Sequence, residues 1–205
     1  LPICRHFFED PMMRLMNFLI LLVVMAGVPA LGAPEPDDPK KQTPWGLYVD
    51  SREAYDMKMA RGDDVLFVDV REPIETMFTG FTDVVDVNIP YMLANPSRWH
   101  PSKSKFAMEV NPDFEPMIAS ALAERGLTKD TPILLMCRSG GTRGAPSAMA
   151  LHGKGYSQVY VVVDGFEGSS LKEGERAGWR LVNGWKNAGL PWSYDLNREK
   201  IYIRP

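Results

Sequence analysis

The feature that most constrains the fold is a short unit in which an apolar run leads into a glycine-rich turn and then into a helix. The apolar run is residues 133–136 (Ile-Leu-Leu-Met), the turn is residues 137–143 (Cys-Arg-Ser-Gly-Gly-Thr-Arg), and the helix is predicted over residues 145–152. An apolar run of this length is typical of a buried strand. In sheets built from such units, ligands bind beyond the carboxyl ends of the strands. The turn therefore lies where a binding site is expected.

The same alternation of apolar runs and helical patterns extends along the chain from residue 45. Further strands are predicted at residues 46–49, 65–70, 84–89, 106–110 and 159–163. Further helices are predicted at residues 52–61, after the cap Asn111 with Pro112 in the first position, and near residues 183–188. Strands that alternate with helices predict an α/β domain with a mostly parallel sheet.

The turn combines one thiol with groups that attract anions. The candidate nucleophile is Cys137, and the candidate anion-binding residues are Arg138, Ser139, Gly140, Gly141, Thr142 and Arg143. A glycine-rich turn directs backbone N–H groups into one concavity, and the start of the following helix adds positive potential. A thiol in such surroundings reacts as a thiolate. Free cysteines are often small buried hydrophobic residues, but that interpretation leaves the glycines and arginines unexplained.

Residues 1–33 are predicted to be a targeting segment. Arg14 precedes an apolar run over residues 15–28, and small residues follow it up to Ala33. A charged start, a short apolar core and small residues at the end are typical of a cleavable secretory signal. The run is short for a membrane-spanning helix, which needs about 20 apolar residues, so an uncleaved anchor is the weaker alternative.

Cleavage is expected after Gly32, and residues 1–11 are interpreted as upstream read-through ahead of a start at Met12 or Met13. The expected destination is the periplasm or the exterior of the cell. Removal of Cys4 would leave Cys137 as the one cysteine, so no internal disulfide could form. An odd thiol in an oxidising compartment is a liability unless it is used, which favours a functional role for this residue.

The rest of the chain is predicted to be one domain with flanking segments. Residues 34–44 are predicted to be a linker, because prolines and charged residues leave few apolar groups there. The domain covers residues 45–194, and a tail over residues 195–205 ends in an alternation typical of an edge strand. Two long connections, near residues 95–111 and 167–182, are expected either to wall the pocket or to pack as surface loops. The formal charge of −3 argues against a general nucleic-acid binder.

Four segments in chain order are similar to motifs of the rhodanese-like family. They are residues 67–73 (FVDVREP), 88–90 (NIP), 137–140 (CRSG) and 184–191 (GWKNAGLP). Each motif alone is weak, whereas four in the same order are a specific match. The resemblance implies a three-layer α/β fold, with a five-stranded parallel sheet and helices on both faces. It also implies a cysteine that carries a sulfane sulfur as a persulfide.

By this resemblance, Cys137 is the sulfur-carrying cysteine and the turn after it surrounds the persulfide. Asp69 and Arg71 belong to the first motif; Arg71 is expected near the turn, and Asp69 is expected to accept N–H groups in a structural role. The implied activity moves sulfur from thiosulfate or a persulfide to a thiol or cyanide. A thiolate is the attacking group in such chemistry. A guanidinium at Arg138 or Arg143 suits an oxyanionic donor.

The spacing of Cys137 and Arg143 leaves a second enzyme class open. Five residues separate them, where the common rhodanese-like loop has four, and five is the spacing of phosphatases and arsenate reductases built on the same fold. Met136 in place of a histidine, and the lack of a carboxylate inside the loop, favour sulfur transfer. A third alternative is a non-catalytic binding module, against which the retained thiol argues.

The expected partners are a small sulfur-containing anion and a thiol acceptor, with a protein thiol as an alternative acceptor. No cofactor, metal or nucleic acid is expected to take part, and no membrane once the signal has been removed. His100 and His152 are interpreted as surface or packing residues, which disfavours a Cys–His hydrolase.

Overall fold

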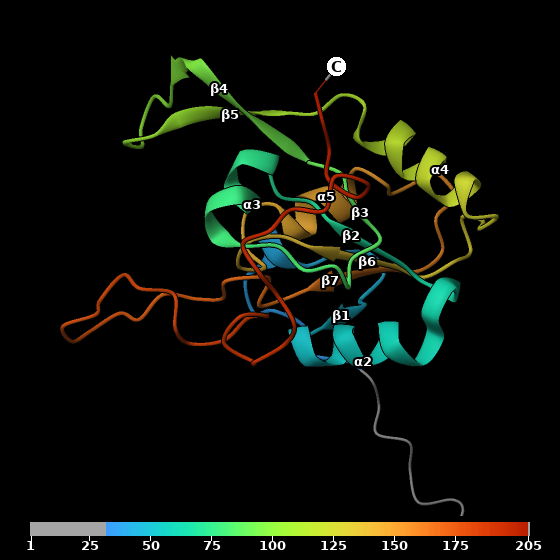
Figure 1. Ribbon diagram of the computed structural model, residues 1–205, viewed down its shortest axis with the longest axis horizontal. Helices are drawn as coiled ribbons and strands as arrows, with labels where there is room; N and C mark the ends of the chain where they lie inside the picture. The colour runs from blue at the N-terminus through green and yellow to red at the C-terminus, as the bar shows by residue number, and fades with distance from the viewer. Residues whose placement is uncertain (1–31, 205) are drawn as a thin grey trace, which may run out of the picture. The chain divides into compact units, whose positions relative to one another are not determined.

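Five parallel strands form the central sheet of residues 32–204, the part of the chain that the computed structural model describes (Figure 1). In chain order these strands are β1 (Tyr48–Val49), β2 (Leu66–Asp69), β3 (Val87–Asn88), β6 (Ile133–Met136) and β7 (Val159–Val162). They lie in the order β1-β7-β6-β2-β3, and every neighbouring pair is parallel. The predicted fold class is confirmed.

Helices cover both faces of this sheet (Figure 1). They are α2 (Ser51–Arg61), α3 (Pro73–Thr79), α4 (Phe114–Glu124) and α5 (Gly144–Met149). On one face, Ile118 of α4 and Ala148 of α5 join Leu135 of β6 in a hydrophobic cluster. On the other face, Ala54 of α2 joins Leu134 in a second cluster. Successive residues of β6 thus point into opposite clusters, as the pleat of a strand requires.

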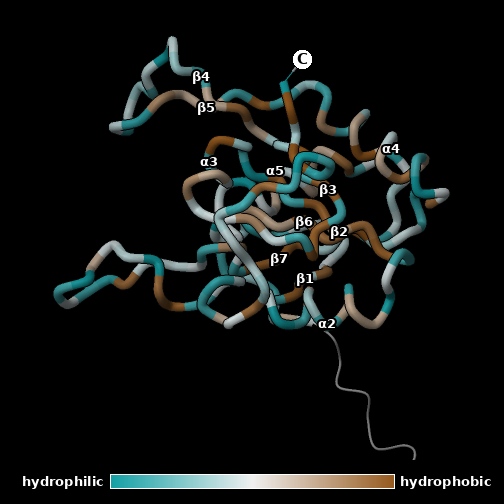
Figure 2. Tube along the Cα trace, viewed as in Figure 1, coloured by the Kyte–Doolittle hydropathy of each residue, from teal (hydrophilic) through white to brown (hydrophobic). Residues whose placement is uncertain are grey.

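The central strands read as continuous apolar runs because both of their faces are covered. Every residue of β2 and of β6 is buried, and Figure 2 shows the central strands mostly in the hydrophobic colour. Strands buried on both faces are typical of parallel sheets between helices. The strands predicted at residues 65–70, 133–136 and 159–163 correspond to β2, β6 and β7, whereas the strand predicted at residues 84–89 is reduced to the two residues of β3.

The sequence signals predict the start of α2 to within one residue but misplace the start of α4. α2 begins within one residue of the prediction, because the Asp50 side chain accepts the Glu53 N–H and the Glu53 side chain accepts the Asp50 N–H. α4 begins at Phe114, later than the prediction from Asn111. The Asn111 side chain accepts the N–H of Asp113 within a turn that precedes the helix. Asn111 is therefore a turn residue, and its assignment as the helix cap is wrong.

The first long connection folds as an antiparallel hairpin outside the central sheet. β4 (Met92–Trp99) pairs with β5 (Phe106–Val110), and Figure 1 shows the hairpin extending away from the sheet. The N–H of His100 donates to the carbonyl of Lys105 and closes the turn between them. The strand predicted at residues 106–110 is β5. β4 is not indicated by the sequence, because Asn-Pro-Ser at residues 95–97 are poor strand formers.

Residues 183–188, predicted as a helix, form turns instead. Gly184 and Gly189 have φ of 95° and 68°, so only four residues lie between two positions outside the helical region. Four residues complete barely one turn of an α-helix. One bond of helical spacing forms, from the Ala188 N–H to the Gly184 carbonyl.

Both ends of the described chain lie along the outer strands of the sheet. The N–H of Ala33 donates to the carbonyl of Tyr48 in β1, and the N–H of Asn88 in β3 donates to the carbonyl of Lys200. The Asn88 side chain also accepts the N–H of Tyr202. The tail therefore pairs with the domain itself, although it forms no regular strand.

The segment predicted as a linker, residues 34–44, rests on the domain. It contains the short 3-10 helix η1 (Pro39–Lys41), and the N–H of Thr43 donates to the hydroxyl of Tyr48. The segment predicted as a signal lies outside the described residues up to residue 31. Within residues 32–204, no helix has both the length and the apolar character that crossing a membrane requires.

Candidate functional site

Cys137 lies at the carboxyl end of β6, directly after the last residue of the strand. The residue is 2% exposed and forms no disulfide. The start of α5 passes close to it, since a methyl group added to Gly144 would lie 3.8 Å from the Cys137 sulfur. The thiol is thus enclosed by the turn that follows it. It stands at the sheet edge where ligands of parallel α/β proteins bind.

Two glycines hold this turn against the segment that follows β7. Gly140 has φ of 62°, and a β-carbon there would overlap the carbonyl of Val163. Gly165 has φ of 63°, and a β-carbon there would overlap the carbonyl of Cys137. Neither position accepts a larger side chain unless the backbone moves. The N–H of Phe166 donates to the same Cys137 carbonyl at 2.8 Å, which fixes the start of the turn.

The backbone N–H groups of the turn are available to a ligand. No backbone carbonyl within residues 32–204 accepts a hydrogen bond from the amides of residues 139–142. Gly140 is buried, whereas Ser139 and Gly141 are half-buried and Thr142 is exposed, so a ligand can reach this part of the backbone. Successive free amides around one point are typical of an anion-binding concavity. The turn can therefore hold the negative charge of a thiolate, or of a second sulfur bonded to it.

Arg143 ends the turn and is bound to Glu75 of α3. Its two terminal nitrogens donate to the two carboxylate oxygens at 2.5 and 2.8 Å. Burial alone would raise the pKa of the Glu75 carboxyl. The hydrogen bonds from Arg143, together with the charges of Arg143, Arg71 and Arg138, outweigh burial and lower this pKa below its ordinary value. Glu75 is therefore ionised at neutral pH and anchors the turn to α3.

Glu75 is the site residue that sequence reasoning missed. One signal could have indicated its position: the Glu72-Pro73 pair, which starts α3. The Glu72 side chain accepts the Glu75 N–H, and proline suits the first turn of a helix. This signal places Glu75 in the first turn of a helix, but it does not identify Arg143 as its partner.

Arg138 lies on the outer side of the turn and pairs with Glu167. Its Nε donates to the carboxylate at 2.5 Å, and its side chain is 42% exposed. The backbone carbonyl of Arg138 accepts the N–H of Glu167 as well. Arg138 lines the pocket described below, and within residues 32–204 its terminal nitrogens donate no hydrogen bond.

Asp69 and Arg71 form a buried ion pair at the end of β2. Both residues are 0% exposed, and Arg71 Nη2 lies 2.5 Å from an Asp69 carboxylate oxygen. Asp69 also accepts the backbone N–H of Arg71. The Arg71 guanidinium donates to the Thr79 hydroxyl and lies 3.9 Å above the Phe166 ring. The contacts of both residues are made within the protein, which agrees with a structural role for Asp69.

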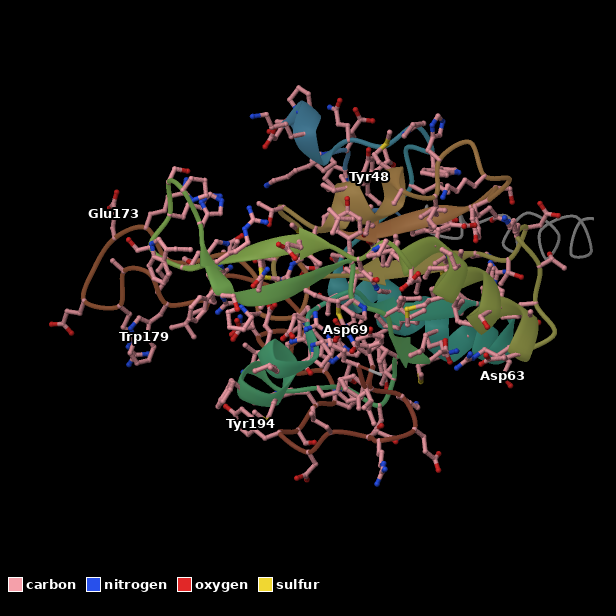
Figure 3. The ribbon with its side chains drawn as sticks, turned by 90° about the horizontal axis from the view of Figure 1, so that it is seen from above. Tyr48, Asp63, Asp69, Glu173, Trp179 and Tyr194 are labelled. Carbon is pink, nitrogen blue, oxygen red and sulfur yellow. The ribbon has the colours of Figure 1, made fainter. Side chains whose placement is uncertain are left out.

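A pocket of about 370 Å³ opens in front of the turn. It is lined by residues from the turn (Arg138, Ser139, Thr142, Arg143), from α3 (Glu75), from the hairpin (Met92, His100, Lys103, Lys105, Met108) and from the second long connection (Arg180). Both long connections therefore form walls of this pocket. Figure 3 shows Asp69 near the centre of the domain and Glu173 and Trp179 on the outer part of the second connection.

Another pocket, of about 560 Å³, is larger but contains no residue of the turn. It is lined by residues around α2, between α3 and β3, and near the chain end, among them Lys58, Phe81 and Lys200. Because four residues of the turn that follows Cys137 line the smaller pocket, that pocket is the candidate site, although Cys137 itself is not among its lining residues.

The fold and the site together define a protein of the α/β class whose cysteine follows a central strand inside a glycine-rich, anion-binding turn. The family model of the Rhodanese-like domain matches residues 51–172, and the chain belongs to this family.

Similar proteins carry names that state no activity. The chain is 28% identical over 144 residues to Uncharacterized protein RP600 of Rickettsia prowazekii, and equally to its homolog in Rickettsia rickettsii. Each alignment covers 70% of this chain and 94% of the relative. The crystal structure of Rv0390 from M. tuberculosis superposes with a TM-score of 0.50 and 25% sequence identity, over 74% of this chain and 99% of that one. Family membership thus leaves the reaction to be argued from the site.

Proposed function

We propose that the protein is a sulfurtransferase that carries a sulfane sulfur on Cys137. The observation that supports this most directly is the enclosed thiol at the end of β6, followed by turn amides that have no backbone acceptor in the described part of the chain. A thiolate and the outer sulfur of a persulfide both carry negative charge, which such amides stabilise. No general base is needed, because the thiolate itself attacks the donor.

The proposed reaction has two steps, neither of which needs an external oxidant or reductant. In the first, the Cys137 thiolate attacks the outer sulfur of thiosulfate. The new bond joins the two sulfurs, and sulfite leaves with the electron pair of the broken S–S bond. In the second, an acceptor thiolate attacks the outer sulfur of the persulfide, and the Cys137 thiolate leaves. The sulfur atom has then moved from donor to acceptor.

The charge of the pocket supports an anionic donor. Five Lys and Arg side chains and one carboxylate line it, on a chain whose formal net charge is −3. A pocket of one sign, partly shielded from water, raises the local concentration of ions of the opposite sign. Thiosulfate carries two negative charges and suits such a pocket.

A phosphatase or arsenate reductase receives less support from the same geometry. In that chemistry, an arginine at the end of the loop would bind the oxyanion through paired donors. The paired donors of Arg143 are already bound to Glu75. The binding-module alternative differs from both enzymes in showing no turnover.

The test is to weigh the intact protein before and after incubation with thiosulfate. A sulfurtransferase gains one sulfur, about 32 Da, and loses it to cyanide or dithiothreitol. Cys137→Ser gains nothing, because a hydroxyl does not ionise in place of the thiol. Phosphate release from p-nitrophenyl phosphate that needs Cys137, without a sulfur adduct, would assign the protein to the phosphatase class. If the protein gains no sulfur and releases no phosphate, the binding-module alternative is the one that remains.

A further inference from the structure

The cations of the pocket fall into two sets. Arg138 and Arg143 come from the turn, and each is paired with a carboxylate. Lys103, Lys105 and Arg180 come from the two long connections, and within residues 32–204 none of them is in an ion pair. The uncompensated positive charge of the pocket therefore lies on the long connections rather than on the turn.

The backbone around these three cations is held in place. The hairpin turn that carries the two lysines is closed by two backbone bonds, from the His100 N–H to the Lys105 carbonyl and from the Lys105 N–H to the Lys103 carbonyl. Arg180 donates from Nη1 to the carbonyl of Gly168, which keeps its guanidinium at the pocket. Three positive charges thus line the same pocket as the turn, and no carboxylate within residues 32–204 forms an ion pair with them.

The same wall also offers apolar contact. Met92 of β4 and Met108 of β5 line the pocket, and both are half-buried. Methionine adapts its shape to irregular apolar ligands. An inorganic anion such as thiosulfate has no carbon atoms for these side chains to contact. A volume of 370 Å³ lies within the usual range for sites that bind small organic molecules.

We propose that the acceptor is an organic thiol of low molecular weight that carries two or more carboxylate or phosphate groups. This inference rests on the proposed sulfur transfer. The thiol sulfur faces the turn above Cys137, the carbon skeleton contacts Met92 and Met108, and the anionic groups meet Lys103, Lys105 and Arg180. In the transfer, the acceptor thiolate forms a bond to the outer sulfur, the bond to Cys137 breaks, and the acceptor leaves as a persulfide.

The experiment compares acceptors of different charge on protein already loaded with sulfur by thiosulfate. The rate of persulfide discharge is measured with mercaptosuccinate, which has two carboxylates, and with 2-mercaptoethanol, which has none. The ratio of the two rates is the readout, because it removes differences in loading. In Lys103→Gln/Lys105→Gln this ratio is expected to fall about 2- to 25-fold, since each exposed charge contact contributes about 1.4- to 5-fold. The ratio also falls with added salt.

The matched control is Lys172→Gln, which removes one positive charge from the second long connection at a position that does not line the pocket. Its ratio is expected to equal that of the unchanged protein. Equal ratios in all three proteins would overturn the inference while leaving sulfur transfer intact.

A binding measurement keeps the inference testable if no sulfur is loaded. Calorimetric titration of Cys137→Ser with mercaptosuccinate should show saturable binding that weakens when Lys103→Gln/Lys105→Gln is added. If mercaptosuccinate binds but thiosulfate loads no sulfur on Cys137, the proposed function is contradicted, whereas the inferred preference of the pocket for dianions still holds. If mercaptosuccinate does not bind Cys137→Ser, or binds equally well when both lysines are replaced, the preference for dianions is refuted.

Discussion

The guanidinium of Arg143 and the carboxylate of Glu75 meet through two parallel hydrogen bonds of 2.5 and 2.8 Å. The pair connects the end of the turn around Cys137 with α3, an element that contributes little else to the core. Paired bonds of this kind fix direction as well as distance. The position of the turn over the thiol therefore depends on a residue 68 positions earlier in the chain.

Replacement of Glu75 by glutamine should destabilise the protein at neutral pH by about 3 kcal/mol, the lower end for breaking a buried ion pair. The pKa of Glu75 is lower in the folded state than in the unfolded state. Its contribution is therefore complete above the unfolded pKa and is lost as the pH falls through the folded pKa. The difference between the two proteins should shrink as the pH falls below the ordinary range of a glutamate. Urea denaturation at several pH values measures this, and a difference independent of pH would contradict it.

Replacement of Asp69 by asparagine should also act on stability rather than on chemistry. The change leaves the guanidinium of Arg71 buried without its counter-charge, which costs about 3–5 kcal/mol. Asp63→Asn is the matched control, because Asp63 is exposed in the 3-10 turn that follows α2 and is in no ion pair within residues 32–204. Thermal and urea denaturation measure the effect. A large loss of sulfur transfer at unchanged stability would instead assign Asp69 to the reaction.

A comparison of Gly140→Ala with Gly153→Ala distinguishes the stability cost of a positive φ from the cost of a steric overlap. Both glycines have positive φ, 62° and 74°, so alanine costs about 1–2 kcal/mol at each. A β-carbon at position 153 meets nothing within 4 Å, whereas at position 140 it overlaps the carbonyl of Val163. Gly140→Ala should therefore lose more stability and also lose sulfur loading, measured by intact mass. Equal behaviour of the two variants would show that the contact with Val163 does not hold the turn.

Export is the remaining expectation from the sequence, and we propose that the chain is cleaved after Gly32. Cleavage there leaves the Ala33 amine able to donate to the Tyr48 carbonyl, as the amide does. The mass of the protein recovered from the periplasm or the medium should correspond to a chain that begins at Ala33. A chain recovered intact from the cytosol would contradict export.

Much of the sheet could be predicted because β2, β6 and β7 lie between two helical layers, so that apolar residues occupy nearly all of their positions. The turn could be predicted because its glycines and arginines are unusual around a buried cysteine. Their order along the chain, read with the three other motifs, also indicated the family. These features are local, so the sequence shows them directly.

The parts that escaped prediction depend on contacts distant in sequence. α3 carries its apolar side chains outward: Ile74 and Phe78 are exposed, while the buried residue is Thr76. A helix with this pattern has no apolar stripe facing the core, so hydrophobic periodicity does not indicate it. Glu75, which lies on that helix, was missed for the same reason. The charge that Lys103 and Lys105 add to the pocket was also missed, because these lysines lie on a hairpin whose first strand has poor strand-forming residues.

The short outer strands of the sheet have a consequence for encounters with other chains. β1 and β3 have two residues each, and the chain's own ends bind the Tyr48 carbonyl and the Asn88 N–H along them. Exposed sheet edges recruit foreign strands and start fibre growth. Here the flanking segments occupy those positions, so recognition by strand addition is disfavoured. Trimming the tail should expose the Asn88 edge of the central sheet and increase the protein's tendency to polymerise.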